Sequence, residues 1–563
     1  MALRVDAIED GGRFDVAVIG SGAAGLAAAL FSAKRGARVL LLERTEHVGG
    51  SSAWSAGTAW LPLTRHAAVG AGDDAETVLG FLDAAVGNRS PRPMREAFVA
   101  AAPPAVAELE AETEVRFRAR SFHPDYMSDL PGATPCGRAI EPQPFDGRRL
   151  GDLLRLVRPP IPEFTLFGGM MVDRDDIGHL LKLTKSFASF RRALGLLARY
   201  GRDRLTHPRG TRLVMGNALI ARFLASLMAH DVTLATGAEI DRLDHDGTRV
   251  TGLGFVHRGR RISVTVGRGV VLASGGFNRH PTRRGERLGT DAAWCPGAPG
   301  HTGTALDLAL GLGARFGEGA LSDAFWAPVS TRTRADGSTA VFPHFLLDRG
   351  KPGMVTVDRN GRRFVNEATS YHLFALAMRE AGAVPAFLVT DAEGLRKYGL
   401  GMVRPGGGGT APFLADGYLA TAATLRELAA KLGIDGDGLV RTVAEMNAHA
   451  ASGVDPDFGR GSTVYQRANG DATHGPNPCL GPIGSAPFYA VRLWPGDIGA
   501  ATGLVTDTRA RVLGPDDAPI GGLHAVGNDM QSIMGGTYPG PGITIGPGIA
   551  FAWIAARDLM GES

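Results

Sequence analysis

Hydrophobic and polar positions near the start of the chain predict a strand, a tight turn and a helix. Residues 14–19 form a short, almost continuous apolar run, which is typical of a buried parallel strand. After a glycine-rich turn, the alanine-rich stretch 26–35 predicts a helix that ends at Gly36. Residues 38–42 predict a second strand. Strands that alternate with helices indicate an α/β fold with a parallel sheet.

The same signals dominate up to about residue 320 and return from about residue 498, whereas the stretch between them is mixed. The elements predicted in this middle stretch are short strands at 354–357 and 363–365 around the turn Asn360-Gly361, a loop at 406–409, and helices at 425–432, behind a capping box of Thr424 and Glu427, and at 439–448. We therefore expect one discontinuous domain, residues 1–320 and 498–563, interrupted by a smaller α+β cap at residues 321–497.

Residues 159–209 carry an amphipathic pattern. The apolar positions recur at spacings of three and four, so they share one helical face: Leu180, Leu183, Phe187, Phe190, Leu194 and Leu197. Basic residues lie opposite them, at Lys182, Lys185, Arg192 and Arg199. With the apolar stretch 164–171 before it, this pattern fits contact of residues 164–204 with an anionic membrane surface. It fits equally a helix that packs on the rest of its own chain or on a second subunit.

Composition narrows the class of protein only modestly. The chain has 563 residues, of which 44% are hydrophobic and 21% charged, and this is enough for two or three packed units of a globular enzyme. Lys and Arg number 60 against 57 Asp and Glu, which gives no reason to expect nucleic-acid binding. Cys136, Cys295 and Cys479 lack the paired spacing of a disulfide framework or a zinc site. No basic apolar leader and no uncharged run of about 18 residues is apparent, so we expect a cytoplasmic enzyme without a metal.

The turn after the first strand is Gly20-Ser21-Gly22-Ala23-Ala24-Gly25. Gly20 permits the tight turn, Gly22 lets the backbone approach a pyrophosphate, and Gly25 allows the helix to pack closely on the strand. The helix N-terminus adds N–H groups and a positive dipole. Glu43 follows 18 residues after Gly25, where a carboxylate can accept hydrogen bonds from a ribose diol. These features predict a dinucleotide site; a glycine-bearing helix start that binds nothing is the alternative.

Residues 48–57 resemble the second flavin-contacting segment of the succinate dehydrogenase and fumarate reductase flavoprotein superfamily. The resemblance continues in residues 270–277, 301–306 and 522–529, so it covers almost the whole chain. It implies a Rossmann-like FAD-binding domain interrupted by a cap, with non-covalent FAD rather than NAD as the cofactor. The cofactor-binding residues that it implies, with those of the glycine-rich turn, are Gly20, Gly22, Ala23, Ala24, Gly25, Glu43, Arg44, Gly50, Ser51, Ser52, Gly57, Ser274, Gly275, Gly276, Asn528, Asp529, Ile543 and Thr544.

The segment Tyr538-Pro539-Gly540-Pro541-Gly542 resembles the signature of 3-ketosteroid Δ1-dehydrogenases. Dicarboxylate reductases of the superfamily resemble one another in having an arginine there, which this chain lacks. Residues 366–371 resemble the segment with that family's proton-abstracting tyrosine, and residues 125–126 resemble the segment with its supporting tyrosine. The resemblance implies that Tyr371 takes a proton from C2 of a 3-ketosteroid, that Tyr126 assists, and that Tyr538 and Gly542 hold the C3 ketone while hydride passes from C1 to flavin N5.

These residue types suit the reaction, because fixed donors on the ketone oxygen stabilise the charge that develops there. A tyrosine with a pKa near 10 is a reluctant base, so we expect a hydrogen bond from Tyr126 to lower the pKa of Tyr371. The reduced flavin then needs an electron acceptor, for which a quinone is one candidate class. Two alternatives stay open: a ketosteroid 4-dehydrogenase, and a flavin-bearing, membrane-associated binding protein without turnover. We assign no role to His123, His301 and His344.

Overall fold

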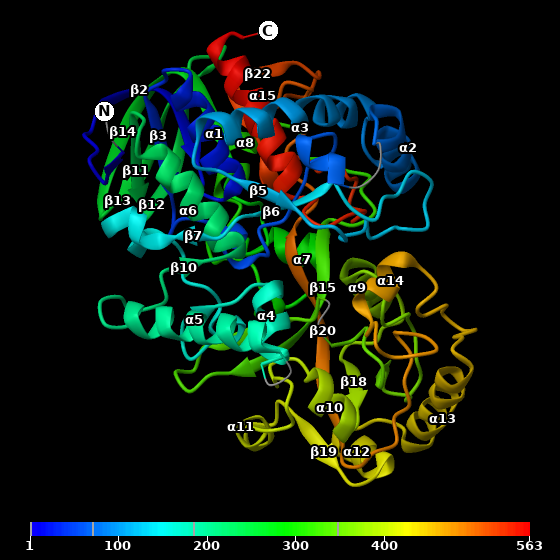
Figure 1. Cartoon of the computed structure of the whole chain (residues 1–563). Helices are drawn as coiled ribbons and strands as arrows, with labels where there is room; N and C mark the ends of the chain where they lie inside the picture. Colours follow the sequence, from blue (N-terminus) through cyan, green and yellow to red (C-terminus); the bar gives the residue numbers. More distant parts are fainter. Residues whose placement is uncertain (1–2, 70–72, 184–185, 346–347, 563) are drawn as a thin grey trace.

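The computed structural model describes residues 3–69, 73–183, 186–345 and 348–562, which form two lobes around two sheets (Figure 1). We call the nine-stranded sheet with its helices the α/β lobe, and the six-stranded sheet with its helices the cap lobe. The chain passes into the cap lobe at β15 and leaves it along β20, which pair with each other. The α/β lobe is therefore assembled from both ends of the chain.

The sheet of the α/β lobe has the order β1-β11-β3-β2-β14-β13-β12, with β22 beside β14 and β21 beside β22. Its central pairs are parallel, whereas β12, β13 and β21 add antiparallel pairs. The strands are β1 (Arg4–Val5), β2 (Gly12–Ile19), β3 (Val39–Glu43), β11 (Val232–Thr236), β12 (Ala238–His245), β13 (Val250–His257), β14 (Arg260–Leu272), β21 (Arg511–Leu513) and β22 (Pro519–Ala525). The predicted strands at 14–19 and 38–42 are confirmed by β2 and β3.

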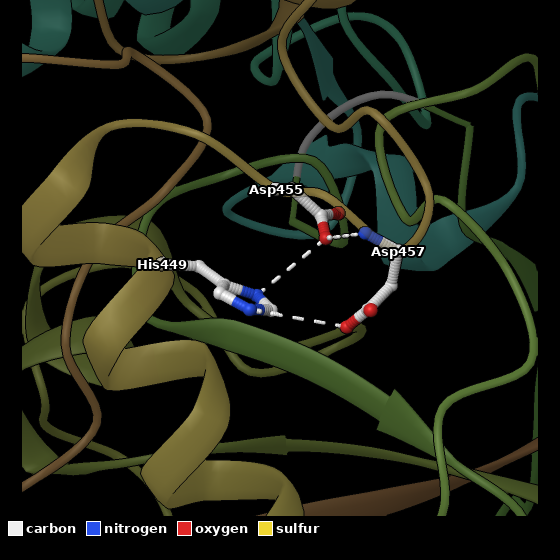
Figure 2. Close-up of side chains that lie close together, drawn as sticks. All are labelled: His449, Asp455 and Asp457. Carbon is white, nitrogen blue, oxygen red and sulfur yellow. Dashed lines mark hydrogen bonds and ion pairs between the residues drawn. The ribbon is translucent and has the colours of Figure 1, made fainter.

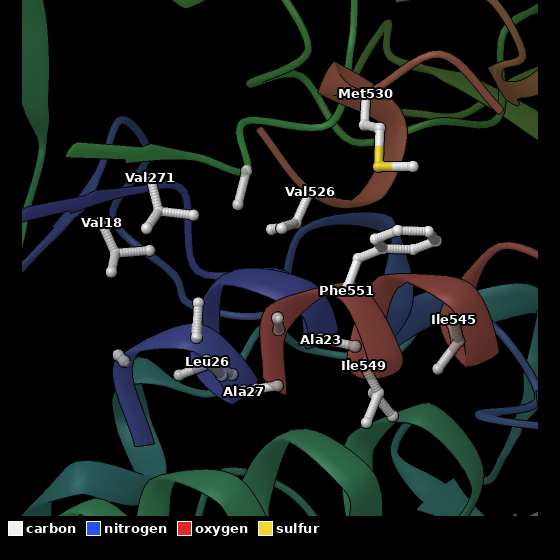
Figure 3. Close-up of a cluster of buried hydrophobic side chains, with 14 of the residues drawn as sticks. Val18, Ala23, Leu26, Ala27, Val271, Val526, Met530, Ile545, Ile549 and Phe551 are labelled. Carbon is white, nitrogen blue, oxygen red and sulfur yellow. The ribbon is translucent and has the colours of Figure 1, made fainter. Parts of the chain in front are cut away.

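Helix α1 (Ala23–Lys34) follows β2 and is buried almost along its whole length, because the sheet, α6 and α15 surround it (Figure 3). The backbones approach closely at the start of α1, where a Cβ on Gly25 would lie 1.9 Å from the carbonyl oxygen of Gly20. The other helices of this lobe are α2 (Ala75–Val86), α3 (Arg92–Glu112), α6 (Met215–Leu227), α7 (Arg283–Leu288), α8 (Thr304–Gly311) and α15 (Ile545–Met560). The packing of α1 on α15 therefore joins the two ends of the chain.

Short elements cover the side of the α/β lobe that faces the cap lobe. They are the three-stranded sheet of β4 (Ala59–Trp60), β6 (Ala139–Pro142) and β5 (Phe117–Ala119), the pair β7 (Phe145–Asp146) and β10 (Arg212–Leu213), and the hairpin β8 (Thr165–Leu166) and β9 (Met170–Met171).

The sheet of the cap lobe has the order β16-β15-β20-β18-β17, with β19 on β20. Its strands are β15 (Ala324–Thr333), β16 (Thr339–Pro343), β17 (Met354–Val357), β18 (Ala386–Thr390), β19 (Ala420–Ala422) and β20 (Phe488–Ala500), and its helices are α9 (Tyr371–Glu380), α10 (Ala392–Tyr398), α11 (Ala411–Ala415), α12 (Leu425–Leu432), α13 (Gly436–Ser452) and α14 (Val464–Asn469). The capping box of Thr424 and Glu427 is confirmed at the start of α12.

The predicted strand at residues 363–365 is wrong. β17 pairs with β18 instead, and the turn at Asn360-Gly361 leads into an irregular segment. Arg363 explains the difference, because its buried guanidinium donates to Glu367 at 2.8 Å and to Asp455 at 2.9 Å. These two ion pairs hold the segment in place of a strand ladder.

The single amphipathic helix predicted across residues 180–197 is also wrong. Two helices occur instead, α4 (Arg174–Leu181), which starts with a capping box, and α5 (Phe187–Asp203), which is capped by Ser186. Of the predicted helix, Lys185 lies outside the described residues. Figure 1 shows α5 at the side of the molecule between the two lobes. No helix of the described part of the chain is long and apolar enough to cross a bilayer.

Candidate active site

A cavity of about 590 Å³ runs from the turn after β2 to the region between the two lobes. One end is bordered by residues 20–24 of the turn, by residues 50–58 and by residues 273–275. The other end is bordered by three tyrosines, Tyr126, Tyr371 and Tyr538. The cavity thus joins the predicted dinucleotide site to the predicted catalytic residues.

The turn after β2 has the geometry that an anion needs. Gly20 has a φ of +105°, and a Cβ there would lie 2.3 Å from the carbonyl oxygen of Ala273. A Cβ on Gly22 would meet only the Ser52 hydroxyl, at 3.7 Å, so space remains in front of the helix. α1 begins there without a side-chain cap from its N-cap residue. The amide groups of its first turn can therefore bind a phosphate.

Glu43 lies at the carboxyl end of β3 and borders the cavity. Its two oxygens accept hydrogen bonds at 2.5 Å from the hydroxyls of Ser21 and Thr45. The backbone N–H groups of Ser21 and Thr45 also donate to these oxygens, at 3.3 Å and 2.9 Å, so a diol in the cavity would have to share or replace one of the four bonds.

Most residues that we assigned to the cofactor border the cavity. They are Gly20, Gly22, Ala23, Ala24, Glu43, Arg44, Gly50, Ser51, Ser52, Gly57, Ser274, Gly275, Asn528 and Thr544. Among the described residues that line it, Gly25, Gly276, Asp529 and Ile543 are not found. Asp529 instead accepts a hydrogen bond from the N–H of Gly276 at 2.8 Å and others from Ser274, so it shapes the turn after β14.

Two residues at the cofactor end had no role in the sequence analysis. The Arg158 guanidinium lies over the ring of Trp54 at 5.4 Å and donates to the Thr45 hydroxyl at 2.6 Å. His301 is buried at the cavity wall, and burial lowers its pKa to about 4, so its ring is neutral. An isolated arginine or histidine carries no signal in sequence, because only the fold brings it to the cavity.

The three predicted tyrosines come together although they lie far apart in sequence. The hydroxyl of Tyr126 donates to that of Tyr371 at 3.3 Å. The rings of Tyr126 and Tyr538 are stacked with centroids 5.7 Å apart, and the ring of Tyr371 meets that of Tyr538 at 5.1 Å. All three phenols therefore face one small region of the cavity.

Tyr371 is the first residue of α9, and the Ser370 hydroxyl caps this helix. The buried guanidinium of Arg349 donates to the carbonyl oxygens of Thr369 at 2.7 Å and Phe345 at 2.8 Å. These bonds hold the segment that leads into α9, and with it the direction of the Tyr371 ring.

A buried carboxylate holds Tyr126 from the other lobe. Asp125 accepts hydrogen bonds from the Trp60 indole at 2.7 Å and from Arg138 at 2.9 Å. The backbone N–H of Tyr126 donates to the carbonyl oxygen of Pro539 at 2.7 Å. Because Pro539 directly follows the third tyrosine, this bond ties two of the three phenols together.

Gly542 borders the cavity just before α15. Its φ of +87° favours glycine, and a Cβ there would lie 2.3 Å from the carbonyl oxygen of Thr58. Within the described residues, its N–H makes no hydrogen bond to the protein. It is therefore a free donor on the wall of the cavity.

The expectation that Tyr126 lowers the pKa of Tyr371 is wrong for the protein by itself. Burial raises the pKa of Tyr371 well above 10, and the neighbouring phenols add to the effect. Burial also raises the pKa of Tyr538 to about 12. All three phenols are thus protonated donors at neutral pH.

Two aromatic residues of the cluster were missed. The ring of Tyr465, the second residue of α14, lies 4.7 Å from that of Tyr126. The ring of Phe345 lies 4.8 Å from that of Tyr371 and borders the cavity. Neither lies in a motif, so only the packing of the two lobes reveals them.

A separate group of potential ligands lies in the cap lobe (Figure 2). His449 lies 3.5 Å from Asp455 and 3.9 Å from Asp457. Asp455 also pairs with Arg363 and accepts from the backbone of residues 457–460. The carboxylate is thus committed to holding the loop after α13.

Comparison with known proteins agrees with this geometry. A family model described as an FAD binding domain matches residues 15–545. A 3-oxosteroid 1-dehydrogenase of Mycolicibacterium smegmatis is 34% identical, over 98% of this chain and 97% of its own length. The structure is similar, with a TM-score of 0.91 and 33% identity, to a crystal structure of 3-ketosteroid Δ1-dehydrogenase from Sterolibacterium denitrificans in complex with 1,4-androstadiene-3,17-dione, and the match covers 98% of this chain and all of the other.

The chain belongs to the 3-ketosteroid Δ1-dehydrogenase family. It is an FAD-dependent oxidoreductase, and its fold is the predicted FAD-binding α/β domain interrupted by a cap. The chain is also similar to a protein with another name. A 4-oxocyclohex-2-ene-1-carboxylate 5-dehydrogenase of Sinomonas cyclohexanicum is 38% identical, over 97% of this chain and 93% of its own length.

FAD fits the residues of the α/β lobe. The open space at Gly22 faces the N-terminus of α1, which suits the pyrophosphate, and Glu43 borders the same cavity, where a ribose diol can replace one of its bonds to Ser21 or Thr45. The same cavity continues to the three phenols. The flavin ring and the tyrosines can therefore contact one substrate.

Proposed function

We propose that this member of the 3-ketosteroid Δ1-dehydrogenase family removes two hydrogens across the bond next to a ring ketone, and that it desaturates C1–C2 of 3-ketosteroids. One observation carries the proposal: the phenols of Tyr126, Tyr371 and Tyr538 and the free N–H of Gly542 meet at the end of the cofactor cavity. Phenols and a backbone amide suit a neutral ketone, whereas a dicarboxylate would call for arginines.

In this mechanism, Tyr538 and the N–H of Gly542 donate to the ketone oxygen. Their positions are fixed before the substrate binds, so they stabilise the enolate charge without reorganising. The polarised ketone makes the proton on C2 acidic, and the hydroxyl oxygen of Tyr371 accepts it. Bound FAD supplies the acceptor for the hydride that leaves C1.

Tyr371 starts the reaction as a phenol, because its pKa is raised. Its proton must therefore be released to solvent before its oxygen can take the one from C2. The Tyr126 hydroxyl, which donates to the Tyr371 oxygen at 3.3 Å, then serves as a hydrogen-bond donor to the phenolate.

The decisive test is anaerobic titration of the holoenzyme with 4-androstene-3,17-dione. We expect the flavin absorbance to bleach as the steroid is oxidised, and NMR of the product to show a new C1–C2 double bond. Saturation of the binding site without bleaching would refute the proposal. A double bond at another position would favour the ketosteroid 4-dehydrogenase that the sequence left open.

A second substrate is favoured by the similarity to the 4-oxocyclohex-2-ene-1-carboxylate 5-dehydrogenase. Its named substrate is also a cyclohexenone, and position 5 lies next to the ketone on the side away from the existing double bond. C2 of a 4-ene-3-ketosteroid has the same relation to its ketone. The three phenols and the N–H of Gly542 can therefore act on a monocyclic ring as well. Anaerobic titration of the holoenzyme with 4-oxocyclohex-2-ene-1-carboxylate tests this second substrate.

We also propose that α5 attaches the enzyme to an anionic membrane surface. Phe187, Phe190, Leu194 and Leu197 share one face of this helix and are 80%, 49%, 55% and 39% exposed. The helix packs instead through a neighbouring face that includes Leu196, in a small cluster with Met170 and Val172. The exposure of these four side chains speaks against their packing on the rest of the chain, and a bare apolar face of this kind marks a contact surface.

Flotation with vesicles of phosphatidylcholine and phosphatidylglycerol tests the attachment. The double variant Phe187→Ser/Phe190→Ser should lose vesicle binding, whereas Val454→Ser, which changes a 62% exposed apolar residue of the cap lobe, should keep it. Failure of the unchanged protein to float would contradict membrane contact. If the double variant instead turned a dimer into a monomer, the face would bind a second subunit.

A further inference from the structure

Two cationic side chains border the cavity near the tyrosines and take no part in the proposed reaction. They are Arg174, at the start of α4, and Lys351, in the loop before β17. Both lie on the side of the cavity formed by the cap lobe and α4, together with Asn469, and not in the α/β turn that suits the pyrophosphate.

Other cations on this wall are already neutralised. Arg120 donates to Glu141 at 2.7 Å and to Asp175 at 2.8 Å. Arg118 lies 3.1 Å from Asp175. These arginines and acids form one network at the wall, and its charges nearly cancel.

Arg174 and Lys351 stand outside that network. Arg174 is exposed, and within the described residues its guanidinium has no ion pair or hydrogen bond. Among the same described residues, Lys351 donates only to a backbone carbonyl, that of Gly470, at 2.7 Å. Burial lowers the pKa of Lys351, the charge of Asp471 raises it in part, and the charge of Arg174 lowers it again, so the two cations are close enough to repel each other. An anion between them would relieve this repulsion.

The cationic pair lies beside the catalytic tyrosines. A second small cavity, of about 20 Å³, is bordered at once by Tyr126, Arg174 and Asn469. Asn469 also borders the main cavity with Lys351. A substrate whose ketone reaches Tyr538 can thus present its opposite end to Arg174 without leaving the cavity.

We propose that Arg174 and Lys351 form a carboxylate subsite, so that the enzyme prefers ring ketones that carry a carboxylate away from the ketone. The inference rests on the proposed oxidation of a ring ketone and specifies the class of substrate. A carboxylate can bind a guanidinium with two hydrogen bonds and an ammonium with one. Two molecules offer this chemistry: a monocyclic acid such as 4-oxocyclohex-2-ene-1-carboxylate, and a 3-ketosteroid with a carboxylate at C17.

The test compares each acid with its methyl ester, which has the same ring and no charge. For the unchanged holoenzyme, kcat/KM should be higher for the acid than for the ester. Arg174→Gln should lower kcat/KM for the acid by about 10- to 100-fold, the usual effect of losing a hydrogen bond to a charged group, and should leave the ester within about twofold. Lys351→Gln should act in the same direction, and Arg174→Lys should restore part of the loss.

Arg441→Gln is the matched control, because Arg441 is an exposed arginine of α13 that does not border the cavity. This variant should leave kcat/KM unchanged for both the acid and the ester. Equal losses for acid and ester in Arg174→Gln would overturn the subsite, since they would indicate a general effect on the fold of α4. The acid with the larger ratio of kcat/KM to that of its ester identifies the ring system that fits the cavity.

Calorimetric titration of the holoenzyme separates this inference from the proposed function. Tighter binding of acid than ester, weakened in Arg174→Gln, supports the subsite even if no flavin is reduced. Flavin reduction by the neutral 4-androstene-3,17-dione, with equal binding of acid and ester, overturns the subsite and leaves the proposed reaction intact.

Discussion

Replacing Tyr371 by Phe separates the chemistry of its hydroxyl from the packing of its ring. The ring is 6% exposed and contacts those of Tyr126, Tyr538 and Phe345, and phenylalanine keeps all of these contacts. The hydroxyl accepts a long hydrogen bond, 3.3 Å from Tyr126, and also interacts with the Tyr538 hydroxyl, so its loss should cost about 1 kcal/mol of folding free energy. The expected damage is therefore to the reaction and not to the fold.

A general base contributes about 10²- to 10⁴-fold to a rate, which corresponds to about 3–5 kcal/mol in the activation barrier. The rate of flavin reduction in anaerobic stopped flow measures this step alone, because reoxidation cannot follow. We expect Tyr371→Phe to slow flavin reduction by at least about 100-fold, with an unchanged flavin spectrum and nearly unchanged melting temperature.

Tyr465→Phe is the matched control. Tyr465 is a buried tyrosine of the same aromatic cluster, but among the described residues its hydroxyl has no hydrogen-bond partner, and its ring does not border the main cavity. This variant should reduce its flavin within a few-fold of the normal rate. If Tyr371→Phe reacted as fast as Tyr465→Phe, another group would be the base and the proposed mechanism would be refuted.

Three further predictions concern pH and backbone geometry. Because burial raises the pKa of Tyr371, log(kcat/KM) should still rise with pH above 8 and the rise should vanish in Tyr371→Phe; a plateau at pH 7 in the unchanged enzyme would contradict this. Gly542→Ala should destabilise the protein by more than the roughly 1 kcal/mol expected for Gly417→Ala, a glycine with φ of +77° and open space around it, as measured by urea unfolding. Burial raises the pKa of the Asp348 carboxyl, but the charge and hydrogen bond of His344, with backbone N–H donors, outweigh it and hold the pKa at about 2. The ionised form therefore contributes about 2 kcal/mol of stability above pH 4, which is lost as pH falls toward 2. Asp348→Asn should flatten the unfolding free energy over that range, and an unchanged dependence on pH below 4 would disprove the role of this pair.

The local elements of the α/β lobe could be predicted because their cause is local. The apolar run of β2, the glycine turn and the start of α1 follow directly from neighbouring residues, as does the capping box of α12. The strand expected at 363–365 fails for the opposite reason. Arg363 is held by Asp455, which lies 92 residues away, and no local pattern reports that pair.

In the candidate active site, too, local motifs could be predicted and long-range packing could not. The segments around Tyr126, Tyr371 and Tyr538 could be found because each lies in a motif of its own, and the structure brings the three rings together. Tyr465, Phe345 and Arg174 could not be found, since their relation to the cavity depends on how α14, α4 and the cap lobe pack. The shifted pKa of Tyr371 escaped prediction because it depends on burial, which motifs do not encode.

The division of the phenols between the two lobes has a consequence for turnover. Tyr371 belongs to α9 of the cap lobe, whereas Tyr126 and Tyr538 are linked through Pro539 on the other side of the cavity. Opening the lobes to release a product would thus separate the 3.3 Å hydroxyl pair together with the ring contact of Tyr371 and Tyr538. An enzyme built in this way would lose its hydroxyl pair whenever it opened to solvent, so the chemistry would be confined to the closed arrangement of the two lobes.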